Sequence, residues 1–134
     1  MDLVSLTRAD AKRQSGPTDL APLLGRWVNV NPATDYLVRV DVAAGETAGA
    51  GLRLRVYGAG SDGPVDWGEG EATPYAAGGA TEAGGFHARY ALGPVETHLA
   101  ANQKLGILVI QSYTSFHDGS GRRAHYAREF FRRL

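Results

Sequence analysis

The sequence predicts an all-β fold, an eight-stranded antiparallel up-and-down barrel that follows a flexible N-terminal arm. Three observations predict it. After Gly25, apolar and polar residues alternate with a period of two in segment after segment. The connections between these segments are short and rich in glycine, and no convincing helical pattern interrupts them. Because a sheet of eight sequential strands has two exposed edges unless it closes, we expect a barrel. A two-sheet sandwich fits the same pattern and is the alternative.

The chain of 134 residues has the length of one domain. Residues 1–18 are polar and hold no period, so we predict a flexible arm there and a single barrel domain over residues 19–134. Asp19 is placed to cap a short helical turn over residues 20–24, which Gly25 ends.

Eight segments carry the strand pattern. In the second, the alternation places Tyr36 on one face with Val40, and Leu37 on the other. The strongest hairpin signal, Asp118-Gly119-Ser120-Gly121, separates the last two. The predicted strands cover residues 26–31, 36–42, 52–57, 67–75, 86–92, 95–101, 105–116 and 123–131.

Charge and composition exclude several classes of protein. Lys and Arg number 14 and so do Asp and Glu, which makes nucleic acid and anionic membranes poor partners. The absence of cysteine excludes disulfides, thiolate metal sites and a cysteine nucleophile. The N-terminus lacks the apolar run of a signal peptide, and no stretch approaches the roughly 20 apolar residues of a spanning helix. We therefore expect a cytoplasmic protein.

Residues 24–29, Leu-Gly-Arg-Trp-Val-Asn, resemble the opening strand of the calycins, which include lipocalins and avidins and begin with Gly-x-Trp. The resemblance implies a lipocalin- or avidin-like barrel with Trp27 as the plug of its closed end. In lipocalins an arginine of the last strand lies across that tryptophan. Arg128 is the match here, and Arg132 is the second choice. Avidins have a ligand-binding Asn where this chain has Asn29, but their other ligand positions have no match, so biotin binding does not follow.

Residues 24–133 also resemble a group of small bacterial barrel proteins of unassigned function. That group tends to carry two cysteines where this chain has Gly60 and Val65, so any redox or metal role of those cysteines is absent here. The shared motifs are Gly25-Arg26-Trp27-Val28-Asn29, Asn31-Pro32, Gly58, Asp66-Trp67-Gly68, Asp118-Gly119-Ser120-Gly121 and Arg128-Glu129-Phe130-Phe131-Arg132-Arg133.

Ligand contacts are expected from residues that face the inside of the barrel. Trp27 is either a packed plug or a pocket floor, and Asn29 lies on its face by period two. A buried Asn needs partners, either a backbone group or a ligand. Tyrosines suit a cavity wall because each joins an apolar ring to one hydroxyl, and they suit an ordinary barrel wall equally. The candidate ligand-binding residues are Trp27, Asn29, Tyr36, Trp67, Tyr90, Tyr113 and Tyr126.

The strand that contains Trp67 leaves its orientation open. Period two places Trp67, Glu69 and Glu71 on one face, so all three point inward or all point outward. If they point inward, the two carboxylates resemble a general acid/base pair, whereas solvent exposure is the ordinary alternative. The candidate proton handlers, should the protein be an enzyme, are Glu69, Glu71, Tyr113 and His98.

No motif predicts a metal or cofactor. None of the four histidines forms a His-x-His or His-x3-His pair, and nucleophile elbows, Walker loops and dinucleotide fingerprints are absent. The glycine-rich stretches join strands to strands, so they do not form a phosphate cradle.

Three functions from different classes remain open. The first is a binding module that encloses a small, largely apolar or aromatic molecule. The second is a cofactor-free cyclase or isomerase that acts on a natural-product intermediate by holding one folded conformer. The third is an interaction or inhibitor module that uses the N-terminal arm and rim loops. A homodimer is also conceivable, because outer faces rich in Arg and Tyr can pair.

Overall fold

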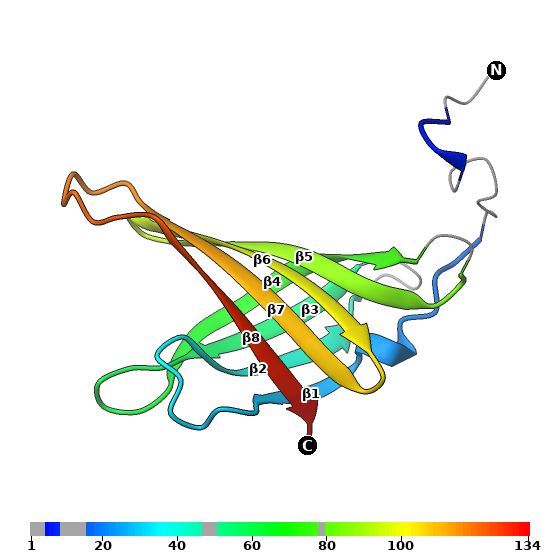
Figure 1. Cartoon of the computed structure of the whole chain (residues 1–134), viewed down its shortest axis with the longest axis horizontal. Coiled ribbons are helices and arrows are strands. Elements are labelled where there is room, and N and C mark those ends of the chain that lie inside the picture. The colour runs from blue at the N-terminus through cyan, green and yellow to red at the C-terminus, as the bar shows by residue number, and fades with distance from the viewer. Residues whose placement is uncertain (1–4, 9–15, 47–50, 78–79) are drawn as a thin grey trace.

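The computed structural model describes residues 5–8, 16–46, 51–77 and 80–134. Its eight strands form one closed antiparallel barrel in the order of the sequence, and β1 pairs with β8 to close it (Figure 1). The predicted fold class is therefore confirmed, and the sandwich alternative is wrong. The strands are β1 Gly25–Asn29, β2 Leu37–Ala44, β3 Leu52–Gly58, β4 Val65–Ala76, β5 Ala83–Leu92, β6 Val95–Lys104, β7 Ile107–Phe116 and β8 His125–Arg133.

A short 3-10 helix, η1 (Ala21–Leu23), precedes the barrel at the predicted place. The N-cap of η1 is Leu20, and no side chain caps the helix, so the prediction that Asp19 is its cap is wrong. The Asp19 carboxylate instead accepts a hydrogen bond from the Ala21 N–H at 3.0 Å, in a turn that leads into the helix. The Asp19 N–H also donates to the Thr81 carbonyl in the loop before β5, and the Asp19 carbonyl accepts from the N–H of Ala83, the first residue of β5. The segment that leads into η1 is thus fixed to the barrel at this end. Most of the predicted flexible arm, residues 1–4 and 9–15, lies outside the described residues.

A bulge in β2 changes which side chains enter the core. The register between β2 and β3 shifts between Leu37 and Arg39, so that Leu37 is buried together with Val40. Tyr36 lies outside and is 43% exposed. The prediction that Tyr36 shares the inner face with Val40 is wrong, because one extra residue reverses the alternation on one side of the bulge.

A second bulge resolves the orientation of the strand that contains Trp67. Between the pairs Arg55–Glu69 and Tyr57–Asp66, β4 has one more residue than β3. This bulge contains Gly68, which has a positive φ of 85°. Trp67 is half-buried and packs against the core, whereas Glu69 is exposed. In an unbroken strand these two side chains share a face. The glycine allows the backbone to insert one residue, so Trp67 points inward and Glu69 and Glu71 point outward.

Trp27 plugs the barrel end next to η1, and it is fully buried beside Phe131. Its indole N–H donates to the Leu23 carbonyl at 2.9 Å. The guanidinium above the ring, 4.5 Å from the centroid, belongs to Arg133, which pairs directly with Trp27 across β1 and β8. The expectation that Arg128 covers Trp27 is wrong.

The same register excludes the second choice. Arg132 pairs with Val28 and therefore points to the opposite face of the sheet from Arg133. Arg128 lies on the outer face as well, over the Phe130 ring at 5.1 Å. Arg133 is held in place by donating to the carbonyls of three residues around η1, namely Ala21, Pro22 and Leu24.

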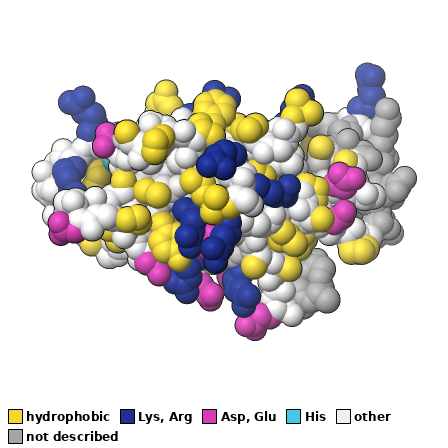
Figure 2. Space-filling model, turned by 90° about the horizontal axis from the view of Figure 1, so that it is seen from below, with side chains coloured by type: hydrophobic (Ala, Val, Ile, Leu, Met, Phe, Trp, Pro, Cys, Tyr) yellow, Lys and Arg dark blue, Asp and Glu magenta, His cyan; other side chains and the backbone are white. Residues whose placement is uncertain are grey.

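The surface mixes apolar and charged groups. Seen from below, basic side chains gather near the middle of the face with hydrophobic ones around them (Figure 2). Among the described residues, no helix has the length and apolar character needed to cross a membrane.

Candidate ligand-binding cleft

The barrel wall opens where β4 and β5 separate. These strands pair from Ala76 to Ala72 on β4 and from Ala83 to Ala88 on β5. Past Ala72, β4 stays with β3 as far as Val65, while β5 stays with β6 as far as its last residue.

Tyr90 of β5 fills the inner side of this opening. The side chain is buried, and its hydroxyl lies 3.3 Å from the Gly68 carbonyl and 3.5 Å from that of Leu54. Burial raises the pKa of Tyr90 to about 12, so the phenol stays protonated near neutral pH. A Cβ at Gly70 would lie 2.8 Å from the Tyr90 ring, so only glycine lets the ring occupy this space.

Trp67 supports Tyr90 from the side, with the two rings edge to face and 5.6 Å apart. The indole in turn lies against Gly58, where a Cβ would approach its nitrogen to 2.7 Å. Both rings belong to the packed interior beneath the opening.

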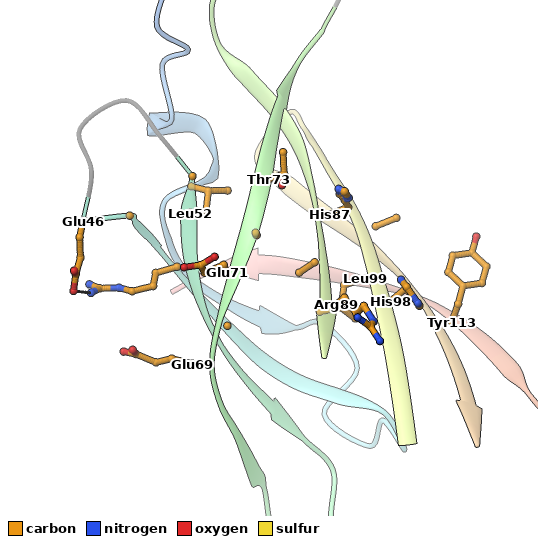
Figure 3. A pocket seen from close by; sticks show the side chains of 17 residues that line it. Glu46, Leu52, Glu69, Glu71, Thr73, His87, Arg89, His98, Leu99 and Tyr113 are labelled. Carbon is orange, nitrogen blue, oxygen red and sulfur yellow. Dashed lines mark hydrogen bonds and ion pairs between the residues drawn. The ribbon is translucent and has the colours of Figure 1, made fainter. Parts of the chain in front are cut away.

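A cleft of about 1220 Å³ lies at the opening (Figure 3). Buried apolar side chains form its floor, namely Leu52, Ala72, Ala88 and Leu99. The two alanines leave room that larger residues would fill. Pockets for drug-sized ligands measure roughly 300–1,000 Å³, so an open cleft of this size accommodates a small molecule.

The rim of the cleft carries opposite chemistry on its two sides. Glu46, Glu69 and Glu71 lie on the side of β3 and β4 (Figure 3). Arg53 of β3 also lines the cleft and pairs with Glu46. The side of β5, β6 and β7 presents a second set, which consists of His87, Arg89, His98 and Tyr113. A bound molecule would therefore meet carboxylates at one edge and histidine, arginine and tyrosine groups at the other.

Several rim groups are held by ion pairs. Arg89 donates twice to Glu96, at 2.8 and 3.0 Å, and the His98 ring nitrogen lies 2.8 Å from the same carboxylate. These contacts lower the pKa of Glu96 to about 2. On the other side, Arg53 lies 3.5 Å from Glu46 and Arg55 lies 3.7 Å from Glu69. The pairs orient the rim, although each is exposed and individually weak.

All four candidate proton handlers line this cleft: Glu69, Glu71, His98 and Tyr113. The structure therefore brings together residues from three strands that the sequence could only nominate separately. Their side chains are on the outer face of the barrel wall rather than inside the barrel.

The candidate ligand contacts are divided among different regions. Trp27 belongs to the end plug, Trp67 and Tyr90 lie beneath the cleft, and Tyr113 is on its rim. The remaining two tyrosines, Tyr36 and Tyr126, are exposed beside a smaller hollow of about 350 Å³ at the other end of the barrel.

Asn29 is bonded within the protein. Its amide nitrogen donates to the Leu37 carbonyl and to a Glu129 carboxylate oxygen, both at 2.7 Å. Its oxygen accepts from the Asn31 N–H at 2.8 Å. Three of the four hydrogen bonds that an Asn side chain can make are thus used. From the sequence, Asn29 is expected to bond either to a ligand or to protein groups, and these contacts fit the second alternative.

Glu129 is an important residue that sequence reasoning missed. Besides Asn29, its carboxylate accepts hydrogen bonds from the Leu37 N–H at 3.0 Å and from the Thr34 hydroxyl. It joins β8 to the loop between β1 and β2. The signal available in the sequence was its position between Ala127 and Phe131, both of which face the core at period two.

No group of three or more His, Asp or Glu side chains within the described ranges is arranged to hold a metal ion. Comparisons of the chain with protein-family models, with curated proteins and with solved structures found no match.

Proposed function

We propose that this protein binds one small, largely apolar molecule in the cleft between β4 and β5. The observation that carries the proposal is the separation of these two strands over a floor of small buried side chains. Ala72 and Ala88 offer an apolar surface to the body of the ligand, and Leu99 extends it. Burial of such surface is the main source of affinity in concave sites.

Polar side chains of the rim would orient the bound molecule. A ligand that carries a polar group at one end can hydrogen-bond to Tyr113 or His98, and one with a basic group can approach Glu71. The proposal keeps the ligand class expected from the sequence but places the molecule in the barrel wall. Binding of a small molecule also agrees with the resemblance to lipocalins and avidins, and membership of the calycins or of the small bacterial group is part of this proposal.

Filling the cleft tests the proposal. Thr73 is exposed and lines the cleft, so Thr73→Trp occupies it without disturbing the core. Asn102→Trp is the matched control, because Asn102 is exposed on β6 outside the cleft lining. We expect the wild type and the control to bind Nile red and hits from an apolar fragment library, and Thr73→Trp to lose at least about tenfold in affinity, or about 1.4 kcal/mol. Equal binding by all three proteins would contradict the proposal.

A second candidate function is catalysis at the same cleft, as a cofactor-free cyclase or isomerase. The observation that favours it is the position of Glu69, Glu71, His98 and Tyr113 along the rim of one cleft with an apolar floor. A carboxylate or phenol near a confined substrate can move a proton while the cleft holds one conformer.

The two functions differ in turnover. A molecule that co-purifies with the protein, identified by native mass spectrometry, is added in excess and its isomers are followed by chromatography. An enzyme converts many equivalents, and Glu69→Gln together with Tyr113→Phe stops conversion even at ligand concentrations high enough to saturate the variant. Unchanged ligand at the end of the experiment supports the binding function alone.

A further inference from the structure

The outer face of β7 and β8 carries aliphatic, aromatic and arginine side chains and no carboxylate. We define the β7–β8 face as four side chains from each strand, Ile107, Val109, Gln111 and Tyr113 with Tyr126, Arg128, Phe130 and Arg132. Cross-strand pairs join them into four rows, Tyr113 with Tyr126, Gln111 with Arg128, Val109 with Phe130, and Ile107 with Arg132. Exposure is 66% for Tyr126, 47% for Tyr113, 41% for Phe130 and 38% for Ile107.

Aromatic and arginine side chains alternate along β8, in the order Tyr126, Arg128, Phe130 and Arg132. When the order is reversed, each arginine falls opposite an aromatic residue, so two copies of the strand face in antiparallel orientation are complementary. A two-fold axis that lies in the plane of the face, across the strands beside Glu129, places a second copy antiparallel on the first. Arg128 then lies opposite Phe130 of the second copy, and Arg132 lies opposite Tyr126 of the second copy.

The β7 half of the face obeys the same symmetry. The axis brings Ile107 opposite Tyr113 of the second copy and Val109 opposite Gln111 of the second copy. Ile107 therefore meets an aromatic ring, Val109 meets the side chain of Gln111, and each arginine meets a ring rather than another arginine. The register of β7 with β8 fixes this correspondence, because both strands contribute residues to the same four rows.

We propose that the protein forms a two-fold symmetric homodimer through the β7–β8 face. Arg, Tyr and Phe are the side chains enriched at protein interfaces, and Tyr and Arg are frequent hot spots. A guanidinium over an aromatic ring is attracted to it, and the attraction increases when both groups leave water. Arg128 already lies over its own Phe130 ring at 5.1 Å, so the arginine and the ring are positioned for a shared stack.

The overall charge of the chain does not oppose association of two copies. Overall, basic and acidic residues balance at 14 each, so two copies approach without net repulsion. A nucleic acid would exploit the two arginines and the exposed rings as well, but the neutral chain lacks the field that draws a polyanion.

The experiment measures mass in solution. Sedimentation equilibrium of the full chain is expected to give twice the 14.2 kDa of one chain. Phe130→Asp removes a ring from the centre of the face and is expected to shift the species to one chain, with at least a tenfold rise in the dimer dissociation constant. Tyr75→Asp is the control, because Tyr75 is an exposed aromatic of β4 outside the face, at 52%. The control stays dimeric.

A second variant guards against misfolding. Arg132→Ala keeps the apolar side chains and is expected to weaken the dimer by a smaller factor while its circular dichroism spectrum is unchanged. A wild type that is monomeric up to high concentration overturns the proposal, and so does a dimer that Phe130→Asp leaves intact. A monomer that binds oligothymidylate, and loses this binding in Phe130→Asp, also overturns it and assigns the face to single-stranded nucleic acid.

Discussion

Removing the carboxylate of Glu129 is expected to loosen the barrel at the end away from η1. Glu129→Ala leaves the Asn29 amide, the Leu37 N–H and the Thr34 hydroxyl without the acceptor that now joins them. Two of these donors belong to buried residues, where an unsatisfied polar group is costly.

The size of the effect follows from those contacts. Hydrogen bonds to a charged group contribute about 1.5–3 kcal/mol each, and bonds that share one acceptor are not additive. We therefore expect Glu129→Ala to lower the free energy of unfolding by about 3 kcal/mol. Glu129→Gln keeps one oxygen acceptor and the shape of the side chain, so a loss of about 1–2 kcal/mol is expected.

Urea unfolding followed by tryptophan fluorescence measures both variants. Glu82→Ala is the control, because Glu82 is exposed in the loop before β5, and its stability should remain within about 0.5 kcal/mol of the wild type. A loss below about 1 kcal/mol for Glu129→Ala, or equal losses for the Ala and Gln variants, would refute the reasoning.

Four further outcomes are expected. Arg133→Ala should destabilise by about 1–2 kcal/mol in a thermal or urea melt, because it removes the guanidinium that covers the Trp27 indole, whereas Arg26→Ala, at an exposed position of β1, should change stability by less than about 0.5 kcal/mol. The pKa of Glu96 is lowered from 4.5 to about 2, so its pairing stabilises the fold above pH 4.5 and is lost as the pH falls towards 2. In Glu96→Gln, the free energy of unfolding should depend less on pH between pH 4.5 and 2 than in the wild type. An unchanged pH dependence in the variant would argue against the pairing. Because burial raises the pKa of Tyr90 to about 12, an alkaline titration followed by phenolate absorbance should show one tyrosine that ionises at higher pH than the others. The Tyr90→Phe variant should lack this last transition. Gly70→Ala should displace the Tyr90 ring and lower the melting temperature. An unchanged melting temperature would mean that the ring can move aside without loss of stability, contrary to this account.

The fold was accessible from the sequence because alternation and turn residues are local signals. The run from Leu52 to Tyr57 alternates without interruption, and its burial alternates in the same way. Asp118 lies in the loop between β7 and β8, and its carboxylate accepts a hydrogen bond from the Ser120 N–H at 3.0 Å, as turn chemistry predicts. Closure followed from the number of strands and the need to remove edges.

The site was less accessible because it depends on irregularities and on distant partners. The bulge at Gly68 decides that Trp67 and Glu69 point to opposite sides, and a strict period of two hides such a change. The pairing of Trp27 with Arg133 joins strands more than a hundred residues apart, so a shift of one position in register separates the correct arginine from its neighbour.

The cleft itself arises from hydrogen bonds that β4 and β5 do not share beyond Ala72 and Ala88. Nothing in the composition of either strand marks the point at which they separate. Glu69, Glu71, His98 and Tyr113 could be nominated as chemically able side chains, but only the three-dimensional course of the strands assembles them on one rim.

An amide-resolved NMR titration of the wild-type protein with Nile red tests the central proposal most directly. If the opening between β4 and β5 is the binding site, the largest shifts fall on Gly70, Ala72, Ala88 and Leu99, and they saturate with a single dissociation constant. Shifts that centre on Trp27 and Phe131, or on residues far from β4 and β5, would contradict it.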